Sequence, residues 1–579
     1  MSKIREKQNH RISIEWFLFC VMLVVVDIIL IWKSHYGYGA NDESFYLTIS
    51  HRLSKGDALL VDEWHMSQMS AFITYPIMKL YTALVGTTEG ILLHFRWIFI
   101  FVKNVVAFVG MALLSKKYKI GAVCAMAVYM LFTPYNLLQL CYNSMGLSCL
   151  LLAGILFVTI EKGTEKVACK GFFCGVFLAL AVLCCPYLAT LYLILAVLCL
   201  IWWKKFADKI YIRKLSYVTL GCVFMALVFM IFVLSRASIS EIFANIPEML
   251  KDPEHPIQSI KTSTINLCRS FYQFYPVATI IWLLEVALIV IENFVLHIRK
   301  STKQFGHGFY YISIMALGAV VSLLQLAGNI TFTYNLIMVP LVYLGIIIYL
   351  VAYFEKNRNV SKKPMVLGFF GLWYGFLLNM SSNNQLNIFS CASTIAVIAT
   401  VLLLYEYLCK RDYGKIYKKC IGMCVFILAV STQILIITFS VTHHAFWEDD
   451  ISLLKTKIEE GPLEGIYTSE EHAKEYYNTI EDLSWFKDQE EGTFAFFSEK
   501  PYVYLYVDMP YGTHSGWSGK YATQKYMSDS YYKIHEDKIP VYVYVEKNLC
   551  EEKEVYQMAE KNGYNVIQRN YGYILVKES

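Results

Sequence analysis

Apolar runs of about twenty residues recur from Ile14 to about Val441 and are separated by short polar segments. Helices of that length cross the hydrocarbon core of a bilayer. The runs predict thirteen membrane spans, at residues 14–32, 90–114, 120–138, 144–160, 170–185, 187–203, 214–234, 274–296, 308–327, 334–353, 364–380, 386–409 and 418–440. The fifth and sixth spans share one apolar run that is interrupted at Cys185-Pro186-Tyr187, so two short helices or one kinked helix would fit the pattern there.

Composition supports a polytopic membrane protein. Of the 579 residues, 56% are hydrophobic and 17% are charged, and the mean hydropathy is +0.44. The first apolar run follows Lys3, Arg5, Lys7 and Arg11, is too long for a signal-peptide core and has no clear small-residue cleavage site before Asn41. We therefore expect it to be retained as a span.

The positions of Lys and Arg predict the topology. With a cytoplasmic N-terminus, the basic segments 116–119, 162–170, 204–214, 299–303, 356–363 and 410–419 all lie inside. The alternate short connections, 139–143, 186, 328–333 and 381–385, contain no Lys or Arg. This asymmetry satisfies the positive-inside rule only if residues 171–203 cross twice, which favours two helices there. Thirteen spans then place the C-terminus outside the cell membrane.

The topology implies a domain plan. Residues 1–441 form the transmembrane domain, with outer loops at 33–89 and 235–273, and residues 442–579 form a soluble extracytoplasmic domain. That last segment has 14 Lys and Arg against 25 Asp and Glu, a net charge of −11, which leaves +16 for the membrane part of a chain whose total is +5.

Strands and helices alternate in the pattern of the C-terminal segment. It predicts strands at 465–468, 493–498, 502–507, 541–546 and within 564–576, and helices at 470–486 and about 551–562, which together make a small α/β domain. The segment has no Gly-x-Gly-x-x-Gly motif and no phosphate loop, so we expect no nucleotide cofactor there. The predicted fold class is mostly α, a transmembrane helical bundle with this outer domain.

Candidate chemistry starts at Asn41-Asp42-Glu43, about ten residues after the first span. Asn41 or Asp42 can cap a helix whose apolar residues recur at three- and four-residue spacing while its basic residues face elsewhere. The apolar positions are Phe45, Tyr46, Ile49 and Leu53, and the basic ones are His51, Arg52 and Lys55. We expect this helix to lie on the membrane surface.

These features resemble a family. An Asp-Glu pair after the first span, a surface helix, Gly56-Asp57 about fourteen residues on, an aromatic segment with Pro76 and then Arg96 near the start of the second span are similar to the GT-C-type membrane glycosyltransferases. Within them the chain looks most like protein O-mannosyltransferases and lipid A aminoarabinose transferases, which use polyprenyl-phosphate sugars. The Lys-Pro-Pro common in the latter is absent, so the donor sugar is not carried over.

The resemblance implies an inverting transfer in which Asp42 is the general base and Glu43 supports it. A carboxylate at the lipid boundary is partly desolvated and therefore more basic, and it can take the proton of the acceptor hydroxyl. The leaving lipid phosphate needs cations. Outer candidates for binding it are Arg96, Lys79, Arg236 and Arg269, with Lys261 as a further one.

Several residues have alternative interpretations. Asp42 and Glu43 could be helix-capping acids stabilised by the helix dipole. Asp62 and Glu63, followed by His65, could form a solvated turn, contact the acceptor, or bind a divalent ion with Asp42. Tyr511, His514 and Trp517 lie in an aromatic, turn-rich segment that suits carbohydrate stacking or the core of the outer domain. No resident cofactor or dedicated metal site is expected.

Charges within the spans offer further hypotheses, because a charge in hydrocarbon usually has a partner. Asp27 and Arg96 lie at similar depths, as do Lys103 and Glu285, so each two could form a pair. A lipid-linked-sugar flippase, in which Lys103 and Glu285 are part of a proton path, and a membrane protein with a carbohydrate-binding outer domain are the alternatives to an enzyme. The expected function is transfer of a hexosyl or pentosyl group from a polyprenyl-phosphate donor to a glycan, lipid or protein acceptor on the outer face.

Overall fold

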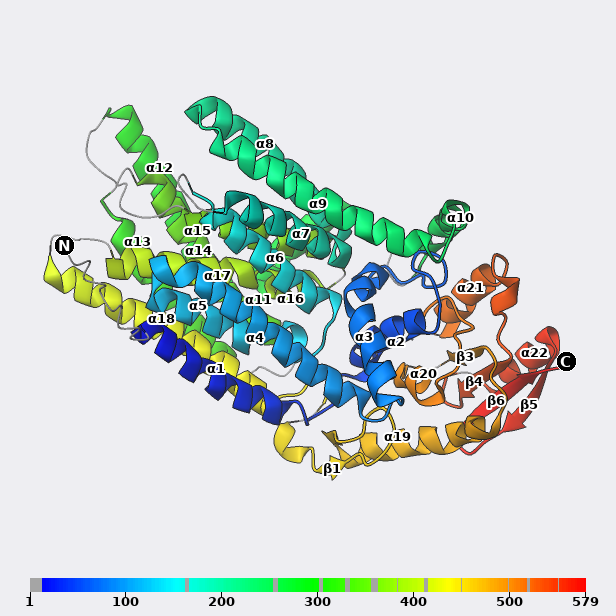
Figure 1. Ribbon diagram of the computed structural model, residues 1–579. Helices are drawn as coiled ribbons and strands as arrows, with labels where there is room; N and C mark the ends of the chain where they lie inside the picture. Colours follow the sequence, from blue (N-terminus) through cyan, green and yellow to red (C-terminus); the bar gives the residue numbers. More distant parts are fainter. Residues whose placement is uncertain are drawn as a thin grey trace, which may run out of the picture.

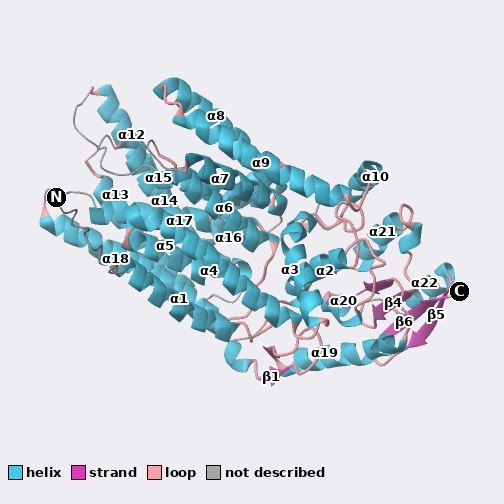
Figure 2. Ribbon diagram, viewed as in Figure 1, coloured by secondary structure: helices cyan, strands magenta, loops and turns pink. Residues whose placement is uncertain are grey.

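The computed structural model describes residues 13–161, 166–253, 259–300, 306–327, 334–355, 363–382, 384–410, 415–448, 450–497, 499–517, 521–549 and 551–578. Long helices form a bundle, and a smaller body with the β-strands covers one end of it (Figure 1, Figure 2). Helix α1 (Ile14–Lys33) starts at the far end of the bundle and runs toward this body. Of the predicted connections, Lys162, Lys303, Lys356, Arg358, Lys362, Arg411 and the loop 328–333 lie outside the described residues.

The bundle consists of helices whose large apolar side chains partly face outward. On α12, for example, Leu284 and Phe294 are 60% and 61% exposed, as expected for side chains that contact lipid. The bundle helices after α1 are α4 (Ile91–Tyr118), α5 (Ile120–Leu131), α6 (Tyr142–Thr159), α7 (Val167–Cys184), α8 (Ala189–Phe206), α9 (Ile210–Leu234), α12 (Pro276–Ile298), α13 (Gly308–Leu326), α14 (Val339–Phe354), α15 (Lys363–Met380), α16 (Gln385–Ala392), α17 (Thr394–Leu404) and α18 (Ile416–His443).

Each predicted span coincides with a helix or a pair of helices, but the number of clear spans is smaller than thirteen. Among the described residues, ten helices are long and apolar enough to cross a membrane, or eleven if the bent pair α16 and α17 counts as one span. Helix α5 has 12 residues and is short for a span. Helix α15, at 18 residues, is not among the ten. The side of the membrane on which each terminus lies therefore stays a prediction.

The apolar run 171–203 forms two helices, as the charge pattern favoured. Helix α7 ends at Cys184, and α8 begins at Ala189 after a short turn that starts with Pro186. Helices α7 and α9 pack with their backbones in close contact. A Cβ atom on Gly175 would overlap the Val218 carbonyl oxygen, and one on Gly221 would overlap that of Phe172. Small residues permit this approach, as is common between membrane helices.

The two loops that the sequence predicts to be outer loops fold into short helices. Helices α2 (Ala40–Ser54) and α3 (Ala71–Val85) come from the first loop, and α10 (Ile239–Met249) and α11 (Ile260–Phe274) from the second. Helix α2 lies between the bundle and the C-terminal body (Figure 1). The two kinds of side chain on α2 do not differ in exposure, because His51 and Arg52 are as buried as Phe45 and Ile49. That α2 lies at the membrane surface stays a prediction.

The C-terminal segment contains a four-stranded sheet and helices, which agrees with the predicted α/β pattern. The strands are β3 (Phe494–Phe497), β4 (Tyr542–Glu546), β5 (Tyr564–Gln568) and β6 (Gly572–Lys577), in the order β3-β4-β6-β5, with β3 and β4 parallel and the other pairs antiparallel. Two short strands, β1 (Thr456–Lys457) and β2 (Tyr467–Thr468), pair separately. The helices are α19 (Glu470–Leu483), α20 (Tyr502–Val507), α21 (Tyr521–Tyr531) and α22 (Glu552–Asn562).

Within the C-terminal segment, one predicted strand is wrong, and one helix was missed. Residues 502–507 form helix α20, because this short apolar segment follows Pro501 and is packed by tertiary contacts at Tyr502, Val503 and Leu505, all at most 1% exposed. Strand propensity is a weak guide when a segment is buried on most sides. Helix α21, which the sequence pattern did not predict, carries Tyr531 into the interface with the first outer loop.

The C-terminal segment shares a hydrophobic core with the first outer loop. Leu47 of α2, Met78 of α3 and Phe95 of α4 pack in one cluster with Tyr504 and Ile574. Backbone hydrogen bonds join the two parts as well, since the Tyr467 amide donates to the His35 carbonyl at 2.7 Å. The domain boundary near residue 442 stays a prediction, but the segment after it is packed against the loop that carries the candidate acids.

Candidate functional site

Helix α2 presents both candidate acids in its first turn. The helix begins after Gly39, so the prediction that Asn41 or Asp42 is the N-cap is wrong. Glu43 serves the helix start instead, because its Oε2 accepts a hydrogen bond from the Gly39 amide at 2.9 Å. The helix dipole favours acids at the N-terminus of a helix, so helix formation alone accounts in part for the presence of Asp42 and Glu43 there.

Arg96 binds both carboxylate oxygens of Glu43. The Arg96 Nε donates to Glu43 Oε1 and Nη2 to Glu43 Oε2, both at 2.6 Å, and the remaining guanidinium donors reach the carbonyls of Ser34, Tyr36 and Gly37. Both side chains are buried. All five Arg96 donors are thereby used. The geometry thus supports the ion pair with the outer carboxylate and leaves no donor for a lipid phosphate.

The other charges in the spans do not pair as expected. Asp27 accepts from Asn104 Nδ2 at 2.8 Å rather than from Arg96. Lys103 donates to the Phe132 carbonyl at 2.8 Å and to Thr133, while the carboxyl oxygens of Glu285 have no hydrogen-bond partner among the described residues. Neither predicted pair is formed among the described residues.

Asp42 differs from Glu43 because its carboxylate faces a cavity of about 680 Å³. No hydrogen bond to this carboxylate is found among the described residues. Burial raises the pKa of Asp42 to about 6, and the adjacent Glu43 carboxylate adds to the shift. At neutral pH the group is ionised yet basic enough to accept a proton, as a general base requires.

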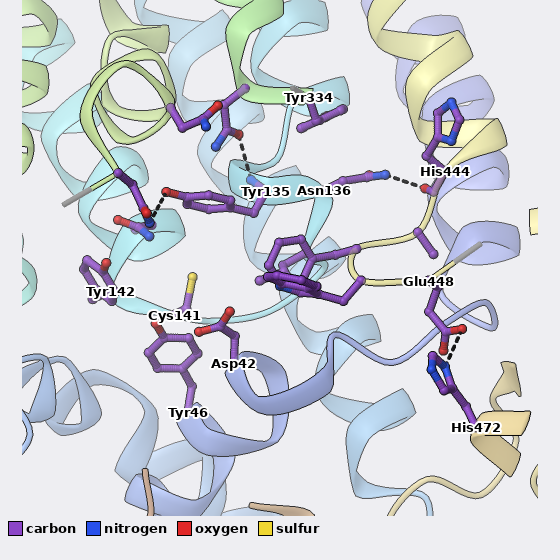
Figure 3. A pocket seen from close by; sticks show the side chains of 18 of the residues that line it. Asp42, Tyr46, Tyr135, Asn136, Cys141, Tyr142, Tyr334, His444, Glu448 and His472 are labelled. Carbon is purple, nitrogen blue, oxygen red and sulfur yellow. Dashed lines mark hydrogen bonds and ion pairs between the residues drawn. The ribbon is translucent and has the colours of Figure 1, made fainter. Parts of the chain in front are cut away.

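The cavity lies where the bundle meets the C-terminal body, and distant segments build it (Figure 3). Asp42 and Tyr46 come from α2, Tyr142 begins α6, and His472 comes from α19; their side chains surround one space. The wall is rich in aromatic rings and amides. Further lining residues include Tyr135, Asn136, Asn143, Tyr334, Asn335, Asn387, His444, Phe446, Trp447 and Glu448.

Sequence reasoning missed these cavity residues. Two segments that supply many of them, 134–143 and 443–448, follow apolar runs and contain no Lys or Arg; the first carries amides and tyrosines, and the second carries Phe446 and Trp447. The absence of Lys and Arg from such segments predicts the topology. The polar residues that gather at the same ends of several spans indicate, in addition, a shared site. Asn136 shows how such a residue is held, because its Nδ2 donates to the His444 carbonyl at 2.6 Å.

The second acidic pair, Asp62 and Glu63, belongs to a buried ionic network around Arg52. Arg52 donates to Asp57 at 2.6 Å and to Glu63 at 2.9 Å, and Lys538 of the C-terminal body donates to Asp57 at 2.6 Å. Asp62 accepts from the Ala58 amide at 2.7 Å. The solvated-turn interpretation is therefore wrong, and these acids hold the outer loop to the C-terminal body.

A metal site built from these acids is not supported. Asp62 and Glu63 are used in the network around Arg52, whereas Asp42 lines the cavity. Within the described ranges, no group of three or more His, Cys, Asp or Glu side chains could hold a metal ion.

The aromatic, turn-rich segment of the C-terminal body is mostly core. Tyr511 is 1% exposed, and its Oη lies 3.0 Å from His51 Nδ1. His514 is buried, which lowers its pKa to about 3, and its backbone carbonyl accepts from the Trp64 amide. Trp517 is half-buried and packs against Phe45 and His65. The core interpretation fits Tyr511 and His514, and none of the three lines the cavity of Asp42.

The remaining predicted phosphate ligands lie outside the lining of that cavity. Arg236 donates to the carbonyls of Leu53 and Asp57 and stacks on Tyr75 and Phe232. Lys79 on α3 and Arg269 on α11 have exposed side chains. Lys261, at the start of α11, is also exposed.

Comparisons with known proteins give a likeness in structure alone. No family model matches the chain, and no curated protein matches it. The chain is similar to ArnT from Cupriavidus metallidurans in a crystal structure bound to undecaprenyl phosphate, with a TM-score of 0.49 and 12% identity over 97% of this chain and 98% of that one. The apo state of the same ArnT gives a TM-score of 0.42 and 11% identity over 96% and 97% of the two chains.

Proposed function

We propose that the chain is an integral membrane glycosyltransferase that moves a sugar from a polyprenyl-phosphate donor to an acceptor on the extracytoplasmic face. The observation that carries this proposal is the setting of Asp42, a desolvated carboxylate on the wall of a cavity of about 680 Å³ at the end of a membrane bundle. Its position after the first span is also the feature that resembles GT-C-type glycosyltransferases.

The proposed reaction is a single displacement that inverts the configuration of the anomeric carbon. The acceptor hydroxyl attacks the anomeric carbon, and its proton passes to Asp42. The bond between the anomeric carbon and the phosphate oxygen breaks, and its electron pair leaves with the polyprenyl phosphate. Glu43 positions α2 by its bonds to Arg96 and to the Gly39 amide, and it takes no part in proton transfer.

The cavity wall supports a sugar as the transferred group. Tyr46, Tyr135 and Tyr142 offer aromatic faces and hydroxyls, and Asn335 and Asn387 add amide side chains to the lining. Apolar walls with a few polar groups are typical of ligand pockets. Sugar rings combine apolar C–H faces with hydroxyl donors, so they match this lining.

The donor phosphate needs positive charge, and the cavity lining contains no Lys or Arg among the described residues. Lys79 and Arg269 stay candidates, because their exposed side chains lie on outer helices where a lipid phosphate is expected. The donor's phosphate would then lie at the membrane surface and its sugar in the cavity.

Transfer of label from a panel of polyprenyl-phosphate sugars by the purified protein in lipid tests the proposal. Transfer by wild type and its loss in Asp42→Asn is the expected result. Movement of intact labelled lipid across the bilayer without transfer would contradict the enzyme and favour a flippase. An active Asp42→Asn protein would contradict the assignment of the base alone.

A further inference from the structure

A second cavity, of about 360 Å³, adjoins the cavity of Asp42. Trp447 and His472 line both, so the two spaces share a wall. The other walls of the second cavity come from Tyr38, which precedes α2, and from the C-terminal body, where α19, residues 499–502 and residues 546–549 contribute. A molecule bound there would lie next to the space that Asp42 faces.

The His472 side of the shared wall is held by several contacts, whereas Trp447 is 58% exposed. Glu448 is buried and accepts hydrogen bonds from His472 Nδ1 at 2.9 Å and from Thr468 Oγ1 at 2.6 Å (Figure 3). The Tyr38 ring packs edge-on against His472 and Tyr502, with ring centres 6.0 and 6.3 Å apart. These contacts orient the wall before any ligand arrives, which lowers the entropic cost of binding.

The second cavity is lined by carboxylates and aromatic rings. Glu475, Glu499 and Glu546 face one cation other than histidine, Lys500, which binds both Glu475 (2.8 Å) and Glu546. Because Lys500 is engaged twice, negative charge is left in excess, and exposed Glu499 contributes to it. An anionic group would be repelled from this lining.

Tyr502 also lines this cavity. Tyr502 is 1% exposed, and its hydroxyl makes no hydrogen bond of standard geometry with the described residues. The neighbouring Thr479 hydroxyl donates to the Glu475 carbonyl instead. The Tyr502 hydroxyl is therefore enclosed by the protein beside Thr479, and Tyr502 adds an aromatic ring to the lining.

We propose that the second cavity is the acceptor subsite and that it takes a hydroxyl-bearing glycan without anionic substituents. This inference rests on the proposed function, because it assumes that the sugar is transferred in the cavity of Asp42. The acceptor's ring packs on Tyr38 and Trp447, its hydroxyls donate to the carboxylates, and one hydroxyl reaches Asp42 past the shared wall. Carboxylates accept hydrogen bonds from neutral donors but cannot pair with phosphate or carboxylate groups.

The test compares neutral hexose di- and trisaccharides with the same sugars phosphorylated at one hydroxyl, as acceptors for the wild-type protein in lipid. We expect kcat/KM for the neutral sugars to be at least about tenfold higher. Glu499→Lys should shrink this ratio severalfold toward the phosphorylated acceptors. Glu491→Lys, the same charge change at an exposed residue of the same body that does not line the cavity, should leave it unchanged.

A second readout separates this inference from the proposed function. Equilibrium binding of the same sugars to Asp42→Asn protein is measured with and without Glu499→Lys, so no turnover is needed. Binding that prefers neutral sugars, without transfer by wild type, would support the glycan subsite and overturn the transferase. Transfer by wild type with equal use of both acceptor classes, or a ratio that Glu499→Lys does not change, would overturn the subsite and leave the transferase standing.

Discussion

The two ends of helix α2 carry acids in opposite circumstances. At its N-terminal end Asp42 faces a cavity with no hydrogen-bond partner among the described residues, and burial raises its pKa to about 6. Beyond its C-terminal end Asp57 and Glu63 are also buried, but Arg52 binds both. Glu43, next to Asp42, belongs with the paired acids because Arg96 binds it.

The presence or absence of a cationic partner distinguishes structural acids from reactive ones. A buried carboxylate with a guanidinium partner is stabilised as the anion, so its ionisation costs little free energy. A buried carboxylate without a partner gains free energy from taking a proton, which is the property of a base. Burial alone does not separate the two kinds of acid, since the partners decide.

The largest expected effect is on catalysis at the unpaired end. Asp42→Asn should lower the transfer rate by about 10²- to 10⁴-fold, the usual contribution of a general base, while the protein still folds. Turnover of a labelled polyprenyl-phosphate sugar measures it, with the exposed Asp488→Asn as a control that keeps full activity. Full activity of a folded Asp42→Asn protein would remove the contrast between the two ends.

The paired end should respond in stability. Arg52→Leu leaves Asp57 and Glu63 buried without their guanidinium and should cost about 3–5 kcal/mol of unfolding free energy. Unfolding of the detergent-solubilised protein by heat or denaturant measures this loss of stability. Exposed Arg213→Leu should change stability by less than about 0.5 kcal/mol. A small loss for Arg52→Leu would mean that the network is weaker than its burial suggests.

The next largest effect should be the pH dependence that Asp42 gives to stability and activity. The folded pKa of Asp42 is raised from 3.8 to about 6, so protonation favours the fold and its contribution to stability declines as pH rises from about 4 to 6. Asp42→Asn should therefore be more stable than wild type above pH 6, by about 1–3 kcal/mol. In wild type, kcat/KM should fall as pH drops below about 6. Equal stability of both proteins at pH 8 would contradict the raised pKa.

The smallest expected effect is at the exposed edge of the network. Asp508 binds His51 at 2.9 Å and Lys55 at 2.7 Å, but its side chain is 48% exposed. Burial opposes its ionisation, yet the bonds from His51 and Lys55 lower its pKa overall, so its stabilising effect is present above pH 4 and is lost as pH falls through the folded pKa. Asp508→Asn should cost about 0.2–1 kcal/mol at pH 7, measured as above. A cost as large as that of Arg52→Leu would show that exposure does not weaken this pair.

Local patterns in the sequence were enough to predict much of the fold. Runs of apolar residues located the bundle helices, and Pro186 together with the charge asymmetry separated α7 from α8. The strand and helix patterns of the C-terminal segment predicted β3, β4 and α22 at about their observed places. The pattern failed at residues 502–507, where tertiary packing turned a strand-like segment into helix α20.

The site was predictable in part. Asp42 was singled out by its place after the first span, and the structure puts it on a cavity wall. The cations were assigned less well, because Arg96 and Arg236 are held by protein groups. Asn136, Trp447 and His472 were missed, since they are separated from Asp42 by up to several hundred residues and have no distinctive motif.

Neighbouring residues and their transfer free energies set which segments are apolar enough to enter a membrane, where helices break and where the excess acid lies, so these features can be predicted from the sequence. The pairing of the acids cannot be predicted in this way, because it depends on the fold. Asp42 and Glu43 are adjacent and chemically alike, yet Arg96 from α4 reaches one of them while the other faces a cavity walled by α6 and α19. Pairing and desolvation depend on distances between remote segments, and the fold alone sets those distances.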